Sequence, residues 1–168
     1  MAVTMAVSGI ILTALLSFTV YAAKSFAALE NYTDLEQKSQ NALDVMTRDI
    51  RETQCLTNFG TRVVSGQMVT NRVTFMDSDD QLLTFHFTNK ALLRQKGGVD
   101  TTLLTNVDFL TFLIYQRNPV GGSYDQFSTT NAGNCKLISV SWVCSRSILG
   151  SRLNTESVQT AKIVIRKQ

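Results

Sequence analysis

The first stretch of the chain is apolar on every side. Residues 2–23 carry no charged side chain and are interrupted only by serines, threonines and one glycine. A helix of this length spans about 33 Å, enough to cross a hydrocarbon layer of about 30 Å. Because no face of it would be polar, the pattern favours a membrane span over a buried core helix. A cleaved signal peptide is the rival interpretation, but no basic residue precedes the run and Tyr21-Ala22-Ala23 is a poor cleavage site.

Small side chains recur on one face of this span. Gly9, Thr13 and Ser17 follow one another every four residues, and Ala2 and Ala6 continue the row toward the N-terminus. Small residues let helices approach one another closely in a membrane, so this row is the predicted assembly surface. Its hydroxyl groups are compatible with lipid because they can return their hydrogen bonds to the helix backbone.

The helical pattern continues past the span. Neither proline nor glycine occurs between Lys24 and Phe59. Residues 24–55 therefore predict an amphipathic helix that prolongs the first, giving one helix from about Ala2 to Gln54 that would be about 80 Å long. The residues predicted to pack on a following domain are Phe26, Leu29, Leu43, Met46 and Ile50. Charged residues occupy the opposite face, namely Glu30, Asp34, Lys38, Asp44, Arg48 and Arg51.

From Met68 the apolar period changes to two, which is typical of half-buried strands. Short turn signals at 77–80, 89–90 and 97–98 predict a run of antiparallel hairpins. The segment Val107–Tyr115 is apolar at nearly every position and predicts a central strand covered on both sides. Residues 118–134 read as a long loop. The expected fold class is α+β, with the long helix packed on an antiparallel β domain over residues 56–168.

Composition and motifs give no site for catalysis. The net charge of +3 is too small to argue for a nucleic-acid partner. His86 is the one histidine, and without paired cysteines it excludes the usual zinc sets. Asp77, Asp79 and Asp80 favour a hairpin turn over a calcium loop, since the glycine and later glutamate of such a loop are missing. We therefore expect no enzyme activity, catalytic residue, cofactor or metal.

Three cysteines are the disulfide candidates, Cys55, Cys135 and Cys144. If residues 135–144 form one extended strand, the two later cysteines lie about 30 Å apart and cannot pair. Cys55, placed at the end of the helix, would instead reach one of them. One cysteine must stay unpaired within the chain, and the connectivity remains open.

Three stretches together resemble the type IV pilin-like proteins. They are the apolar segment AVTMAVSGIILTALL with Gly9, the helix end NALDVMTRDIR, and the closing strand SVQTAKIVIR. The chain is most similar to the J-type minor pseudopilins of type II secretion and the W-type minor pilins. The family's basic leader, cleavage site and glutamate are missing, and Ser17 stands where many members have a proline.

The resemblance implies a structural subunit that works by assembly into a pilus or pseudopilus. It implies a bacterial inner-membrane protein with one span and a periplasmic domain, which enters a filament after assembly. The implied partners are other pilin subunits, assembly-platform proteins and, for the full-length precursor, the prepilin peptidase. The alternative is a single-span or secreted β-domain protein that binds a ligand through residues 118–134.

Overall fold

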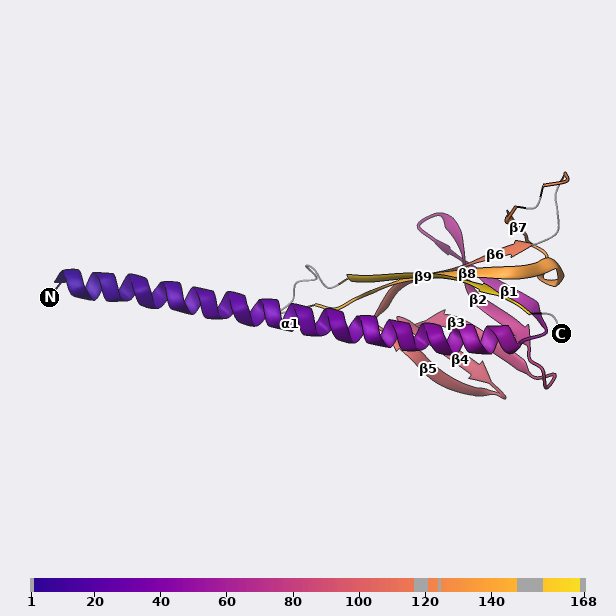
Figure 1. Ribbon diagram of the computed structural model, residues 1–168, viewed down its shortest axis with the longest axis horizontal. Helices are drawn as coiled ribbons and strands as arrows, with labels where there is room; N and C mark the ends of the chain where they lie inside the picture. Colours follow the sequence, from indigo (N-terminus) through magenta and orange to yellow (C-terminus); the bar gives the residue numbers. More distant parts are fainter. Residues whose placement is uncertain (1, 117–120, 124, 148–155, 167–168) are drawn as a thin grey trace.

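The computed structural model describes residues 2–116, 121–123, 125–147 and 156–166. It begins with helix α1 (Ala2–Glu52), which runs without a break from the apolar segment into the β domain (Figure 1). The one long helix expected from the sequence is thereby confirmed. Thr53 ends it, because both its backbone N–H and its hydroxyl donate to the carbonyl of Ile50. The backbone N–H of Gln54 then donates to Met76, so the chain enters the sheet at once.

Within the described residues, nine strands form one antiparallel sheet whose main order is β5-β4-β3-β2-β6-β8-β9. Strand β1 pairs with β2 and strand β7 pairs with β6. The bounds are β1 (Cys55–Val64), β2 (Gln67–Met76), β3 (Leu82–Thr88), β4 (Ala91–Lys96), β5 (Val99–Thr105), β6 (Val107–Gln116), β7 (Phe127–Ser128), β8 (Cys135–Ser145) and β9 (Glu156–Val164). A short 3-10 helix, η1 (Ala132–Asn134), precedes β8.

Tight turns set the register of the first five strands. In the turns at Ser65-Gly66, Asn89-Lys90 and Gly97-Gly98 both central residues have positive φ. This is the mark of the type I′ turn, whose twist suits paired antiparallel strands. The turns expected at 77–80, 89–90 and 97–98 are confirmed, each joining consecutive strands. The sequence prediction missed the hairpin β1–β2. It placed Cys55 at the end of the helix, whereas Cys55 is the first residue of β1.

The sheet curls around the C-terminal half of α1, so the helix contacts β5 and β9, the two ends of the strand order (Figure 1). Met46 and Ile50 are fully buried in the shared core, and Leu43 packs against it half-buried, as expected. The sheet contributes Val73, Phe75, Leu83, Phe85, Leu110, Phe112, Val140 and Trp142. This is the expected α+β layout of one long helix on an antiparallel sheet.

Strand β6 is covered on one face only, which corrects the expectation of a strand buried on both sides. Leu110 and Phe112 point into the core, whereas Phe109 and Leu113 are 38% and 48% exposed. The reason is that α1 covers the concave face of the sheet, while the described residues place no layer on the convex face. The alternate residues of β6 therefore remain accessible.

Candidate assembly surface

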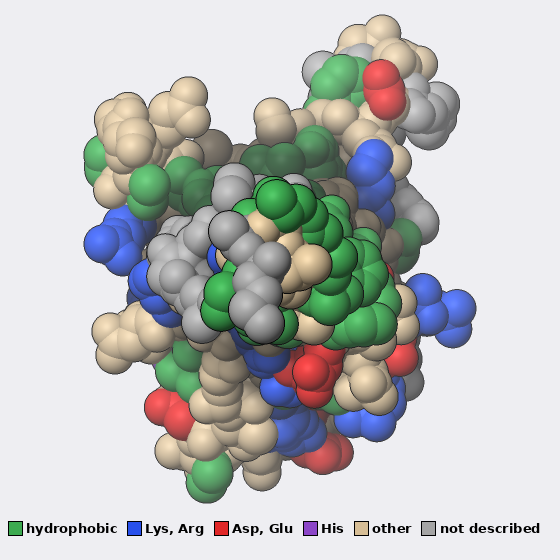
Figure 2. All heavy atoms as spheres, turned by 90° about the vertical axis from the view of Figure 1, so that its left-hand side faces the viewer, with side chains coloured by type: hydrophobic (Ala, Val, Ile, Leu, Met, Phe, Trp, Pro, Cys, Tyr) green, Lys and Arg blue, Asp and Glu red, His purple; other side chains and the backbone are tan. Residues whose placement is uncertain are grey.

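The N-terminal half of α1 projects from the β domain as an apolar rod. Residues 3–21 are exposed at every position. Figure 2, which looks at the molecule from this end, shows hydrophobic side chains gathered around the projecting helix, with charged side chains on the body behind it. The helix is long and apolar enough to cross a membrane. An exposed apolar surface of this extent needs lipid or another protein to cover it.

The hydroxyl groups in the rod bond to their own helix. Thr13 donates to the carbonyl oxygens of Gly9 and Ile10, at 3.1 and 2.9 Å, and Ser17 donates to that of Thr13 at 2.8 Å. Ser8 and Thr19 behave in the same way. Each of these four serine and threonine hydroxyls is thus satisfied without water, as expected, which lets them lie in a lipid layer.

The small-residue row lies open on this rod. Ala6, Gly9, Thr13 and Ser17 are all exposed, and a Cβ placed on Gly9 would meet no atom within 4 Å. Nothing within the described chain therefore requires glycine at that position. The side chain of Ala2 lies outside the described residues. The row is available to a neighbouring helix that needs a close approach.

Polar contacts fasten the helix to the sheet where the rod meets the domain. The Asp34 carboxylate lies 2.5 Å from Arg146, and the Glu36 carboxylate accepts from Ser157 at 3.0 Å and Gln159 at 2.7 Å. One turn on, the Trp142 indole N–H donates to the buried Ser39 hydroxyl. Hydrogen bonding from Lys38, together with the Arg146 charge, lowers the pKa of Asp34, while desolvation acts in the opposite sense.

A buried ion pair fixes the far end of the helix. Asp49 sits on the buried stripe, and its carboxylate lies 2.5 Å from Arg94 of β4. The sequence prediction missed this contact, as it missed those of Glu36 and Arg146. For Asp49 a signal existed, because it falls within a turn of Met46 and next to Ile50, and an acidic residue on an apolar stripe needs a buried partner.

Two residues expected to pack on the sheet do not. Phe26 and Leu29 are 72% and 63% exposed, so their assignment to the helix-to-sheet interface is wrong. In Phe26, Leu29, Tyr32 and Leu35 each step is three residues, and such a step falls about 60° short of a full turn. After three steps the row has moved to the other side of the helix, and Leu35 is the first of the four to be buried.

The three candidate cysteines are free thiols. Cys135 and Cys144 stand at opposite ends of β8, which confirms that they cannot pair with each other. Burial raises the pKa of both thiols to about 11, so both are protonated and unreactive at neutral pH. No bond joins Cys55 to either of them in the described structure.

The other candidate positions form no recognisable chemical centre in the described part of the chain. Asp77 closes the β2–β3 turn and pairs with Lys96, while Asp79 and Asp80 are exposed. No group of three or more His, Cys, Asp or Glu among the described residues is placed to hold a metal ion. His86 is half-buried on β3. Of the loop 118–134, residues 118–120 and 124 lie outside the described residues.

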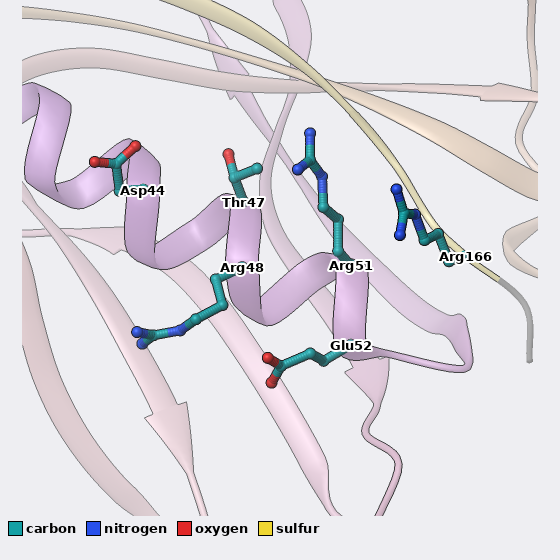
Figure 3. Close-up of a pocket in the computed structure, with 6 residues that line it drawn as sticks. All are labelled: Asp44, Thr47, Arg48, Arg51, Glu52 and Arg166. Atoms are coloured by element: carbon teal, nitrogen blue, oxygen red, sulfur yellow. The ribbon is translucent and has the colours of Figure 1, made fainter.

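A shallow hollow lies at the C-terminal end of α1, with a volume of about 550 Å³. Its lining includes Arg48, Arg51 and Arg166, and Figure 3 shows Arg51 of the helix and Arg166 beyond β9 pointing to the same side. Comparison of the chain with models of protein families and with curated proteins gave no match in either case.

Proposed function

We propose that this chain is a structural subunit, a minor pilin or pseudopilin, of a type IV pilus or type II secretion pseudopilus. The observation that carries the proposal is the division of α1 into two halves. The first half is apolar and wholly exposed, and the second half is fastened to the β domain by Met46, Ile50 and the Asp49–Arg94 pair. Such a molecule presents a rigid apolar rod to its neighbours, which suits assembly by helix packing.

In this proposal the rod has two uses. Before assembly it spans the bacterial inner membrane once, with the β domain in the periplasm. During assembly it packs against other pilin or pseudopilin subunits along the row from Ala6 to Ser17, with the help of assembly-platform proteins. The prepilin peptidase is the expected partner of a full-length precursor. The chain is proposed to act without catalysis and without a cofactor.

Enlarging the small-residue row tests this function. Gly9→Leu or Thr13→Leu keeps the rod hydrophobic, so the protein should still fractionate with membranes. The larger side chain should hold neighbouring helices apart and reduce subunit association about three- to tenfold. Association is measured by crosslinking in membranes followed by recovery of sheared filaments.

Ala14→Leu is the control, since it also places a leucine on the rod, but on another exposed face. It should leave association close to that of the unaltered protein. Equal assembly by Gly9→Leu, Thr13→Leu and Ala14→Leu would show that the row is not a contact surface. A protein that inserts but forms no assembly in any version would contradict the proposed function itself.

A further inference from the structure

The second half of α1 has a solvent-facing stripe opposite its buried one. The buried stripe follows Leu35, Ser39, Ala42, Met46 and Ile50. The other, here called the outer stripe, follows residues at steps of three or four along the opposite side, all of them exposed: Phe26, Glu30, Thr33, Gln37, Asn41, Asp44, Arg48 and Arg51. Nothing in the described part of the chain covers it.

The membrane-proximal end of the outer stripe is apolar and acidic. A shallow hollow of about 510 Å³ lies there between Phe26, Leu29, Glu30 and Thr33. Nearby Asp34 is engaged by Lys38 and Arg146, so its charge is already neutralised. Glu30 forms no ion pair with any described residue. The exposed carboxylate of Glu30 therefore lies beside the exposed side chains of Phe26 and Leu29.

The distal end of the same stripe is basic. The hollow of Figure 3 is lined by Arg48, Arg51 and Arg166 and by two acidic residues, Asp44 and Glu52. Arg51 and Arg166 point to the same side, whereas Arg48 points away from them. Among the described residues, neither Arg51 nor Arg166 has an ion-pair partner. Two guanidinium groups on one side of a hollow form a fork that suits a carboxylate. The two ends of one stripe thus carry complementary charges.

We propose that a second copy of this chain docks on the outer stripe, parallel to the first and shifted along the helix axis. Glu30 of one copy then enters the hollow of Arg48, Arg51 and Arg166 on the other. The shift is 18 to 21 residues of helix, or about 27–32 Å. Phe26, one turn before Glu30, would lie over the aliphatic stems and guanidinium groups of the arginines. This inference rests on the proposed function, whose partner and register it specifies.

Charge and topology select the shifted parallel arrangement. Two copies aligned without a shift would set Glu30 against Glu30 and Arg51 against Arg51, which is repulsive. An antiparallel pair would satisfy both charge contacts, but its apolar rods would point in opposite directions and could not share one membrane. In the shifted arrangement, the rod of one copy lies alongside about residues 23–44 of the other copy. It therefore forms once that rod has left the lipid.

Cysteine crosslinking in the whole 168-residue chain tests the register. Copies carrying Glu30→Cys and one affinity tag are produced together with copies carrying Arg51→Cys and a second tag, both with Cys55→Ser. In assembled material, a short thiol-reactive crosslinker should join differently tagged copies. The control replaces Glu30→Cys with Asp100→Cys, at an exposed residue of β5, and should give several-fold less crosslinked product. Because the two cysteine substitutions remove the charges of Glu30 and Arg51, assemblies of the unsubstituted chain are also exposed to 1 M salt, where the Debye length is about 3 Å and the contact should loosen.

Four results would overturn the inference. Crosslinking of Glu30→Cys to itself would indicate unshifted copies. Crosslinking of Asn41→Cys to itself would indicate an antiparallel pair, because Asn41 lies midway between Glu30 and Arg51. Assembly without the Glu30–Arg51 crosslink would rule out this contact and leave the proposed function standing. The same holds if Glu30→Cys crosslinks only to a different protein. Absence of any assembly by the unaltered chain would remove both.

Discussion

At the scale of single residues, buried ion pairs show what sequence patterns miss. The buried carboxylate of Asp77 pairs with Lys96, and Asp49 pairs with Arg94 across the helix–sheet interface. Neither partner can be read from the sequence, because each pair joins residues on elements whose relative placement only the folded chain defines. The acidic residues themselves stand at recognisable positions, one in a turn signal and one on an apolar stripe.

The Asp77–Lys96 pair predicts a pH dependence of folding stability. The hydrogen bond from Lys96 lowers the pKa of Asp77 below its ordinary 3.8. Its stabilisation is therefore fully present above pH 3.8 and is lost as the pH falls through the lowered pKa of the folded state. We expect Asp77→Asn to unfold at lower denaturant than the unaltered protein at pH 6, and the gap to close toward pH 2. A gap that is constant from pH 6 to pH 2 would contradict this.

At the scale of elements, α1 and most strands follow from periodicity. Helix α1 was predictable because apolar residues recur every three or four positions with no proline or interior glycine after Gly9. Strand β1 was not, because the tip of its hairpin is exposed on both faces: residues 61–64 and 65–68 bury nothing and show no alternation. Its type I′ turn at Ser65-Gly66 was the remaining signal.

The orientation of α1 gives a prediction for the helix–sheet interface. Met46→Asp should lower the free energy of unfolding by about 3 kcal/mol or more, because it places an unpaired charge at a fully buried position. Asn41→Asp introduces the same side chain at an exposed position and should change it by less than about 0.5 kcal/mol. The denaturant concentrations at the unfolding midpoints of the two variants are compared. Equal midpoints would contradict the assignment of Met46 to the buried face of α1 and Asn41 to the exposed face.

At the scale of the whole molecule, the two halves of α1 are separable. Residues 3–21 are exposed throughout, and the core begins at Leu35. Deleting residues 1–23 should therefore leave a water-soluble monomer that unfolds cooperatively and keeps both helix and sheet in its circular dichroism. An insoluble product, or one without β-sheet signal, would show that the domain depends on the rod for folding.

The candidate surface was predictable only in part at this scale. The rod and its small-residue row follow from composition and spacing, since an uncharged segment needs no tertiary contact to be recognised. The outer stripe follows only partly, because helical spacing places Glu30, Asp44, Arg48 and Arg51 on one face, but the sequence prediction assigned Phe26 to the sheet. Arg166 joins Arg51 from the opposite end of the sequence, which only the fold reveals. Convergence of distant segments is a property of the fold.

The unbroken course of α1 also has a mechanical consequence. Tension applied to the apolar end is transmitted along the helix axis into the domain, with no glycine or proline hinge between Lys24 and Glu52. The anchoring contacts at Glu36, Ser39, Met46 and Asp49 are spread along that axis, so they bear load together in shear. A hinged connection would instead let the domain rotate and peel away one contact at a time. Tension on the rod is thus opposed by all of these helix-to-sheet contacts at once.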